Sequence, residues 1–357
     1  MSSRSVCVSQ NGLSSGLSQL AARAARWSRC AAIVMACGTA MAPALPTFAQ
    51  DRLAATPVAA ASDGLLAQDP RVITGVLPNG VKYAVMQHAN PPGRVSVWMH
   101  VGSGSLNETE EQRGIAHYLE HMAFNGSENF APGSVVDFFQ SLGLRFGMHQ
   151  NAFTSFDQTT YQLALPDNSI EKLDKALLFF ADVSGRLLLD PKEIDEEREV
   201  ILQEKTARKS AQQRTGEAVL KRMIPGSIIG ERLPIGTDET LMAMQRPNFE
   251  AYYSKFYTPA NTTVIAVGDL DTNVLIERIT AAFGGFESKG EAPANQDPMV
   301  EPYTSSFGVL VTDPELTRAS LSIQSITKPV GPSLTEAAVK RDLVQLLGFG
   351  AFNRRIQ

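Results

Sequence analysis

One segment near position 117 constrains the fold more than any other part of the chain. Apolar residues recur in it at helical spacing, which predicts an α-helix with one apolar side. Its polar side carries His117, Glu120 and His121, which lie within roughly 100° of one another around the helix axis. Two histidines at positions i and i+4 let two ring nitrogens reach one Zn²⁺ at about 2.0–2.1 Å. The alternative is two solvent-exposed histidines on an ordinary amphipathic helix.

A catalytic zinc site needs a third protein ligand and an open fourth position. Candidate carboxylates lie on a second helix, which is predicted to begin after Asp190 because an N-cap aspartate, a proline and a first-turn acid follow one another there. Glu197 and Glu204 are two turns apart and share one face of this helix with Glu193, whereas Glu199 points elsewhere. The alternative for the whole cluster is a solvated acidic face. Its members are Glu193, Glu196, Glu197, Glu199 and Glu204.

The first 49 residues differ from the rest of the chain. They contain four arginines and no acidic residue, followed by an apolar run from Cys30 to Ala42 and small residues up to Ala49. This order predicts a signal peptide over residues 1–49 with cleavage near Ala49, and therefore a periplasmic or secreted protein. The run is too short to span a bilayer, so no integral membrane span is expected. Lipoprotein anchoring at Cys37 and a disordered tail are the less favoured alternatives.

Composition narrows the classes of site and partner. The formal net charge is −5 and no dense basic block follows residue 50, which argues against binding to nucleic acid. All three cysteines fall within the predicted signal peptide, so a metal in the mature chain must be held by histidine and carboxylate. Three Asn-x-Ser/Thr sequons are assigned no role, because such matches are frequent by chance. They begin at Asn107, Asn125 and Asn261.

Strand-like alternation and helical spacing succeed each other along the chain, which predicts two domains that each mix strands and helices. The expected strands are residues 81–86, 94–101, 159–165, 262–267, 307–311 and 319–323. The expected helices after the histidine helix are residues 132–142, 169–189, 191–213, 247–256, 271–284 and 333–347. We divide the chain into a linker (50–69), a first domain (70–285), a second linker (286–303) and a second domain (304–357). The second domain is too short for the core that its elements imply, so we expect the sequence to be truncated.

Several ordered motifs resemble the pitrilysin/insulinase family of zinc metallopeptidases, whose His-x-x-Glu-His order defines the inverzincins. The resemblance covers about residues 70 to 285, with a weaker similarity to the start of the next family domain up to Gln357. The motifs are the segments 113–126, 151–154, 197–204, 257–261 and 267–270.

The resemblance implies an α+β fold: a mixed, largely antiparallel sheet flanked by helices, followed by the start of a second similar domain. It implies that His117, His121 and Glu204 bind Zn²⁺ and that Glu120 is the general base for a zinc-activated water. It further implies that Glu197 orients the metal site from outside the ligand set.

The segment Asn151-Ala152-Phe153-Thr154 matches the edge strand with which the family holds a peptide in extended form. Binding by strand addition reads the backbone of a polypeptide more than its side chains. We therefore expect an exported zinc endopeptidase that hydrolyses peptides or unfolded polypeptides. In the family, such domains are repeated along the chain or across subunits and form a clamshell. A later domain carries an arginine and a tyrosine that help to hold the substrate, so a second peptidase-like domain or subunit is expected to complete the clamshell. The alternative is a non-catalytic peptide-binding or partner subunit of a two-chain enzyme.

Overall fold

The computed structural model describes residues 29–33, 64–144, 150–287, 290–291, 293–327 and 335–356. Apart from residues 29–33, the predicted signal peptide lies outside the described residues, and so does the predicted linker up to residue 63. The chain forms two compact units. The large unit comprises Asp69–Lys221 and Pro225–Met299, and the small unit comprises Met1–Gln68, Arg222–Ile224 and Val300–Gln357.

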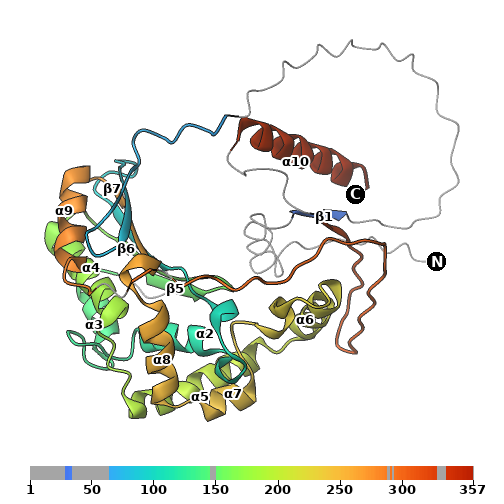
Figure 1. Ribbon diagram of the computed structural model, residues 1–357, viewed down its shortest axis with the longest axis horizontal. Coiled ribbons are helices and arrows are strands. Elements are labelled where there is room, and N and C mark those ends of the chain that lie inside the picture. Colours follow the sequence, from blue (N-terminus) through green and yellow to red (C-terminus); the bar gives the residue numbers. More distant parts are fainter. Residues whose placement is uncertain are drawn as a thin grey trace, which may run out of the picture. The chain divides into compact units, whose positions relative to one another are not determined.

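The large unit is built on a six-stranded sheet with the order β2-β3-β7-β4-β6-β5. Neighbouring strands run antiparallel except β3 and β7, which run parallel. The expectation of a mixed, largely antiparallel sheet flanked by helices is thus confirmed (Figure 1). The strands are β2 (Ile73–Val76), β3 (Lys82–Gln87), β4 (Val95–Val101), β5 (Gln150–Thr154), β6 (Thr159–Leu165) and β7 (Thr262–Gly268).

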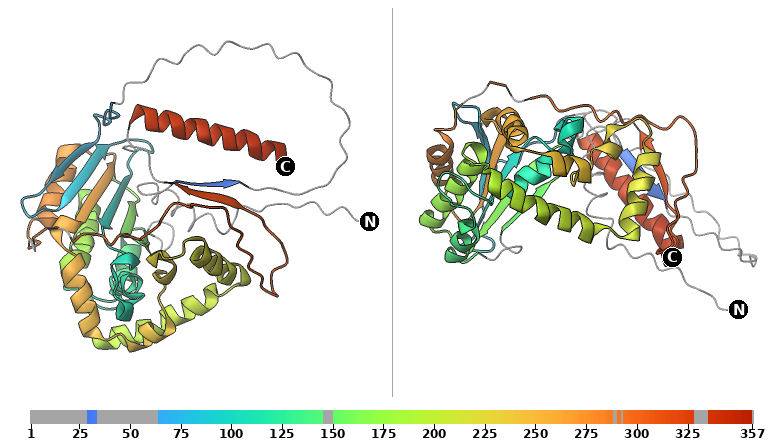
Figure 2. Two further views of the ribbon diagram at one scale, coloured as in Figure 1. Left: turned by 45° about the vertical axis from the view of Figure 1, so that its right-hand side comes forward. Right: turned by 90° about the horizontal axis from the view of Figure 1, so that it is seen from below.

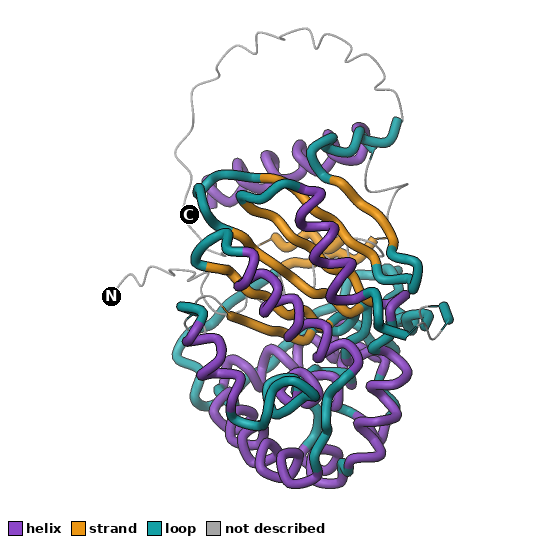
Figure 3. The backbone as a smooth tube through the Cα atoms, turned by 90° about the vertical axis from the view of Figure 1, so that its left-hand side faces the viewer, coloured by secondary structure: helices purple, strands orange, loops and turns teal. Residues whose placement is uncertain are grey.

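One face of this sheet is packed against helices and forms the core. Val97 and Met99 of β4 and Tyr161 and Leu163 of β6 point to this face and are fully buried, in the alternation that the sequence predicts. Trp98, on the opposite face, is exposed. Figure 3 looks onto the covered face, where helices cross over the strands. The helices of the large unit are α2 (Ile115–Met122), α3 (Ser134–Ser141), α4 (Ile170–Gly185), α5 (Pro191–Arg208), α6 (Ala211–Met223), α7 (Asp238–Ala243), α8 (Arg246–Phe256) and α9 (Thr272–Phe283).

The acidic helix α5 begins as predicted but ends earlier. The Asp190 side chain accepts a hydrogen bond from the Lys192 backbone N–H, which satisfies one free donor of the first turn. The prediction of a single helix to residue 213 is wrong, because α5 ends at Arg208 and α6 starts anew. Ser210 lies between them and its hydroxyl accepts a hydrogen bond from the Gln213 N–H, which is the N-cap geometry of a new helix. Figure 2 shows α5 as the long yellow-green helix.

The small unit contains two strands and one helix among its described residues. Strand β1 (Arg29–Ile33) pairs antiparallel with β8 (Ile323–Thr327), and α10 spans Glu336–Ile356. The predicted strands at 307–311 and 319–323 are wrong, since only residue 323 of these ranges is in a strand. An apolar alternation becomes a strand only where a partner supplies ladder hydrogen bonds. Among the described residues, no helix combines the length and apolar character that crossing a bilayer requires.

Candidate metal centre

The histidine helix α2 starts at a tightly packed turn. Its N-cap residue, Gly114, has a left-handed backbone with φ of 99°, which glycine adopts without strain. A Cβ on Gly114 would lie 2.9 Å from the Cα of Gly236, so no larger residue fits there without a shift. Glycine has no side chain to cap the helix. The start of α2 therefore depends on a partner from elsewhere in the chain.

That partner is Glu108, a buried residue that sequence analysis missed. Its two carboxylate oxygens accept hydrogen bonds from the backbone N–H groups of Gly114 and Ala116, both at 2.9 Å. A carboxylate there also interacts favourably with the positive end of the helix dipole. Burial raises the pKa of Glu108 to about 8, although the two backbone hydrogen bonds oppose that shift. No local pattern could have revealed this role, because Glu108 lies six residues before the N-cap.

Helix α2 is buried on both of its sides. Ile115 and Leu119 have no exposed surface, and on the opposite side His117 and Glu120 are each only 7% exposed. The interpretation of the histidines as solvent-exposed groups therefore does not hold for His117. The Tyr118 hydroxyl donates a hydrogen bond to the Ile194 backbone carbonyl, which ties α2 to α5.

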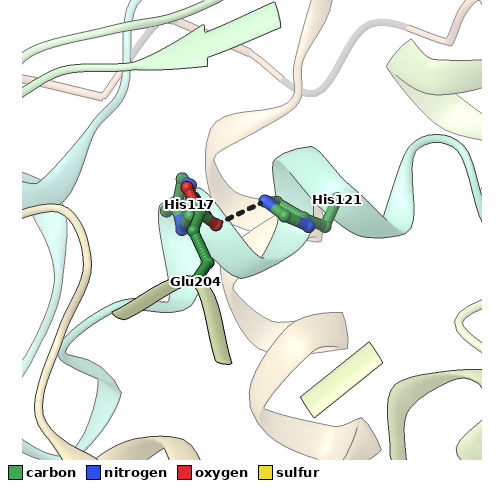
Figure 4. Close-up of side chains that lie close together, drawn as sticks. All are labelled: His117, His121 and Glu204. Atoms are coloured by element: carbon green, nitrogen blue, oxygen red, sulfur yellow. Dashed lines mark ion pairs between the residues drawn. The ribbon is translucent and has the colours of Figure 1, made fainter. Parts of the chain in front are cut away.

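Glu204 of α5 meets both imidazoles of α2. Its Oε2 lies 3.4 Å from His121 Nε2 and 3.8 Å from His117 Nε2, and the two ring centroids are 4.7 Å apart. Figure 4 shows one oxygen of the Glu204 carboxylate directed at a ring nitrogen of His121. Each residue offers one ligand atom, and these three atoms lie within 4.8 Å of one another. Ligand atoms of a tetrahedral zinc with bonds of about 2.1 Å lie about 3.4 Å apart, so the donor set fits this metal.

One buried carboxylate oxygen of this cluster makes no hydrogen bond within the described part of the chain and could therefore bind a cation. Glu204 Oε2 is buried and has no hydrogen-bond partner, although it faces two imidazoles, whereas Glu204 Oε1 pairs with Arg208. An unpartnered buried carboxylate oxygen is costly unless something positive satisfies it. The close approach of His121 keeps the pKa of Glu204 near 2, so the carboxylate carries its charge. Burial, aided by the neighbouring His121, lowers the pKa of His117 to about 3 and keeps that ring neutral.

Glu197, the second acid singled out on α5, lies on the other side of His121. Its Oε1 is 2.7 Å from His121 Nδ1, and its Oε2 accepts a hydrogen bond of 2.6 Å from the Asn125 side-chain amide. Burial opposes charge on His121, but the hydrogen bond with Glu197 and the nearby Glu204 carboxylate raise its pKa to about 9. Glu196, by contrast, pairs with Lys192 at 3.1 Å. The helix thus directs two of its acids to the histidines.

Glu120 faces a small pocket next to this cluster. The Thr154 hydroxyl donates a hydrogen bond of 2.6 Å to Glu120 Oε2. Burial raises the pKa of Glu120 to about 7, against the opposing effect of that hydrogen bond. A carboxyl with a pKa near neutrality can both accept and release a proton. The pocket has a volume of about 140 Å³ and is lined by Glu120, His121, Phe124, Asn125, Ala152 and Glu197.

The predicted edge strand lies at the margin of the sheet and beside the pocket. Strand β5 pairs with β6 alone among the described strands, so its other edge has no strand partner there. Ala152 and Thr154 share the face that α2 covers, because they pair with Tyr161 and Thr159 of β6. Asn151 and Phe153 alternate with them and point to the opposite face.

Comparisons with known proteins place these features in a family. The family model of the insulinase peptidases (peptidase family M16) matches residues 83–229, and the model of the peptidase M16 inactive domain matches residues 243–355. A probable zinc protease PqqL of Escherichia coli is 35% identical over 231 residues, which are 65% of this chain and 24% of that protein. A zinc protease PQQL-like protein of Arabidopsis thaliana is 33% identical over 220 residues, which are 61% of this chain and 23% of that protein.

Solved structures show the same fold. The crystal structure of the first half of the periplasmic protease PqqL from Escherichia coli superposes with a TM-score of 0.64 at 33% identity, covering 67% of this chain and 51% of that one. Pitrilysin superposes with a TM-score of 0.56 at 22% identity, which shows the fold alone, and covers 67% of this chain and 26% of pitrilysin. The chain spans about a quarter of the length of these two curated relatives. By its sequence matches and its fold, the chain belongs to the insulinase family of peptidases, peptidase family M16.

Proposed function

We propose that the chain is the zinc-binding part of an exported endopeptidase. The observation that carries the proposal is the convergence of His117, His121 and Glu204 around one point, with Glu120 buried beside it. The names of the relatives, zinc proteases, agree with this donor set. Two imidazole nitrogens and one carboxylate oxygen are a ligand set typical of catalytic zinc.

The division of labour among the residues follows from their contacts. His117, His121 and Glu204 would hold the metal, and Glu197 would orient His121 through its Nδ1. Zinc, when bound, acts as a Lewis acid that polarises a peptide carbonyl and makes water more acidic. Glu120 would take a proton from the attacking water and pass it to the leaving amine, for which a pKa near 7 is suited.

Substrate would bind along β5. The edge of β5 that has no partner among the described strands would offer backbone N–H and C=O groups to an extended peptide. Asn151, Ala152, Phe153 and Thr154 would line its path. Since backbone groups supply most of such binding, the substrate class is peptides or unfolded polypeptides rather than one sequence. The adjacent pocket of about 140 Å³ would receive a single side chain.

The rest of the proposal concerns organisation. Residues 70–285 would form the catalytic domain and residues 304–357 would begin a second, similar domain. Further domains or a second subunit would complete the clamshell, as expected for a chain that matches the first half of a longer protease. The basic and apolar N-terminal segment would direct export to the periplasm. Zn²⁺ would be the resident metal.

The experiment that tests this function is cleavage of a quenched, mixed peptide library by the full chain, with and without a zinc chelator. The matched variant is Glu120→Gln, which preserves shape and removes the base. We expect chelator-sensitive cleavage that falls by about 10²–10⁴-fold in the variant, with zinc content unchanged. Equal turnover by the variant would refute the role of Glu120. Bound zinc with no cleavage by either protein would mean that the other half of the clamshell is required for turnover, or that the alternative holds and the chain is a partner subunit that binds peptides without cleaving them.

A further inference from the structure

The side chain of Asn125 contacts the metal centre without being one of its ligands. We propose that Asn125 is a positioning residue, which holds Glu197 so that Glu197 holds His121 with Nε2 towards Glu204. The proposal rests on the proposed function, because it assumes that the cluster of His117, His121 and Glu204 binds a metal. It adds a residue outside the ligand set and the base.

The contact between Asn125 and Glu197 has a defined direction. Asn125 Nδ2 lies 2.6 Å from Glu197 Oε2. A carboxylate can only accept hydrogen bonds, so the amide must present its NH₂ group to Glu197. Hydrogen bonds to a charged acceptor are the short and strong ones. The Glu197 carboxylate is therefore held at Oε2 by Asn125 and at Oε1 by His121.

The position of Glu197 decides which nitrogen of His121 is free. His121 Nδ1 faces Glu197 Oε1 at 2.7 Å, and because that oxygen is an acceptor, Nδ1 must carry a hydrogen. In the neutral ring the lone pair is then on Nε2, the atom that faces Glu204 at 3.4 Å. A Glu197 carboxylate free to rotate would no longer select this tautomer and ring orientation. Outer-sphere partners of this kind change metal affinity by about 10–100-fold.

The backbone holds Asn125 firmly enough to act as such a support. Its N–H donates to the carbonyl of Met122 at 3.1 Å, in the turn that ends α2. The next residue, Gly126, has a φ of 115°, a conformation that glycine adopts without strain, and a Cβ on it would lie 3.0 Å from Pro132. Asn125 is also half-buried and lines the pocket beside Glu120.

The sequon that begins at Asn125 thus has another explanation in the structure. The amide nitrogen that glycosylation would modify is the atom that donates to Glu197. The Asn125 side chain thus uses this amide nitrogen to contact Glu197 beside the proposed metal centre.

The test measures zinc affinity of the full chain by competition with a chromogenic chelator at pH 8, so it needs no catalytic activity. The variants are Asn125→Ala, Glu197→Ala and the double variant. The control is Asn168→Ala, which removes another side-chain amide of the large unit, one that donates to the Asp269 backbone carbonyl at 2.9 Å. We expect Asn125→Ala to weaken zinc binding about 10-fold and the control to leave it unchanged. In the Glu197→Ala background, Asn125→Ala should have no further effect.

Asn125→Asp separates positioning from simple electrostatics. The variant keeps the shape, loses the donor and adds a negative charge. If Asn125 acts by holding Glu197, zinc binding weakens at least as much as in Asn125→Ala, because two carboxylates repel each other. Tighter zinc binding by Asn125→Asp, or additive effects in the double variant, would overturn the proposal. A wild-type chain that binds no zinc would overturn the metal centre itself, whereas unchanged affinity in Asn125→Ala would overturn this inference alone.

Discussion

The two helices that meet at the proposed metal centre are built in opposite ways. Helix α2 is buried on almost every side, whereas α5 is polar over most of its surface and buries only Ile194, Arg198 and Ile201. The proposed ligands on α2 are therefore held by the hydrophobic core. The carboxylates on α5 depend on a few buried anchors and on polar contacts. The residues on α2 are therefore fixed by packing, whereas the position of the residues on α5 can be changed by polar substitutions.

The largest difference between α2 and α5 is expected when a buried or an exposed apolar side chain is shortened and the free energy of unfolding is measured. Leu119 of α2 has no exposed surface, whereas Val200 of α5 is 48% exposed. We expect Leu119→Ala to lower the free energy of unfolding by about 2–5 kcal/mol, because it leaves a cavity. Val200→Ala should change it by less than about 0.5 kcal/mol. Urea denaturation of both variants measures the difference, and similar losses would show that the two helices are equally embedded.

Loss of Glu204, the proposed ligand on α5, should act on metal binding more than on folding. We expect Glu204→Gln to weaken zinc binding by about 100-fold or more, since loss of an outer-sphere partner alone can cost that much. The temperature of unfolding without metal should fall only slightly, because the variant loses the contact of Glu204 with His121 and a largely exposed ion pair with Arg208. Chelator competition and thermal unfolding of the metal-free protein give the two readouts. Unchanged zinc affinity would exclude Glu204 as a ligand.

Removing the charged side chain of Arg198, which anchors α5, should lower the free energy of unfolding. Arg198 is buried and donates hydrogen bonds to the backbone carbonyls of Leu241 and Met244. Arg198→Met would leave both carbonyls without this donor, so we expect a loss of about 1–3 kcal/mol in unfolding free energy. The exposed pair of Arg246 and Glu250 offers the matched control, and Arg246→Met should cost no more than about 0.5 kcal/mol. Equal costs in urea denaturation would contradict an anchoring role for Arg198.

Titration of Glu108, which caps α2, should make the free energy of unfolding depend on pH. The pKa of Glu108 is about 8 in the fold and near 4.5 in an unfolded chain, so the folded protein binds more protons between these values. Its contribution is therefore fully present below about pH 4.5 and is lost as the pH rises towards 8, with a slope of up to about 1.4 kcal/mol per pH unit.

Glu108→Gln removes this titration. We expect the difference in unfolding free energy between wild type and the variant to shrink steadily from pH 5 to pH 8, measured in urea. A constant difference over this range would show that Glu108 titrates normally.

Local patterns predicted much of the large unit. The alternation of Val95, Val97 and Met99 placed one face of β4 in the core, and Asp190 with Pro191 marked the start of α5. The patterns failed where a strand needed a partner far away in the chain, as at residues 307–311, and where Ser210 capped a new helix. Propensity describes a segment, whereas pairing and helix breaks depend on neighbours that the segment does not contain.

The sequence by itself determined that His117, Glu120 and His121 share one side of a helix, because a helical period of 3.6 residues is a local property. It also narrowed the partner to the acids after Asp190. The resemblance to the family already singled out Glu204 and Glu197 among these acids. Only the tertiary structure decided how the two carboxylates meet the histidines, that Glu108 caps the histidine helix and that Asn125 contacts Glu197. The physical reason is that these contacts join elements packed by the core, and burial selects partners by position in space rather than by distance along the chain.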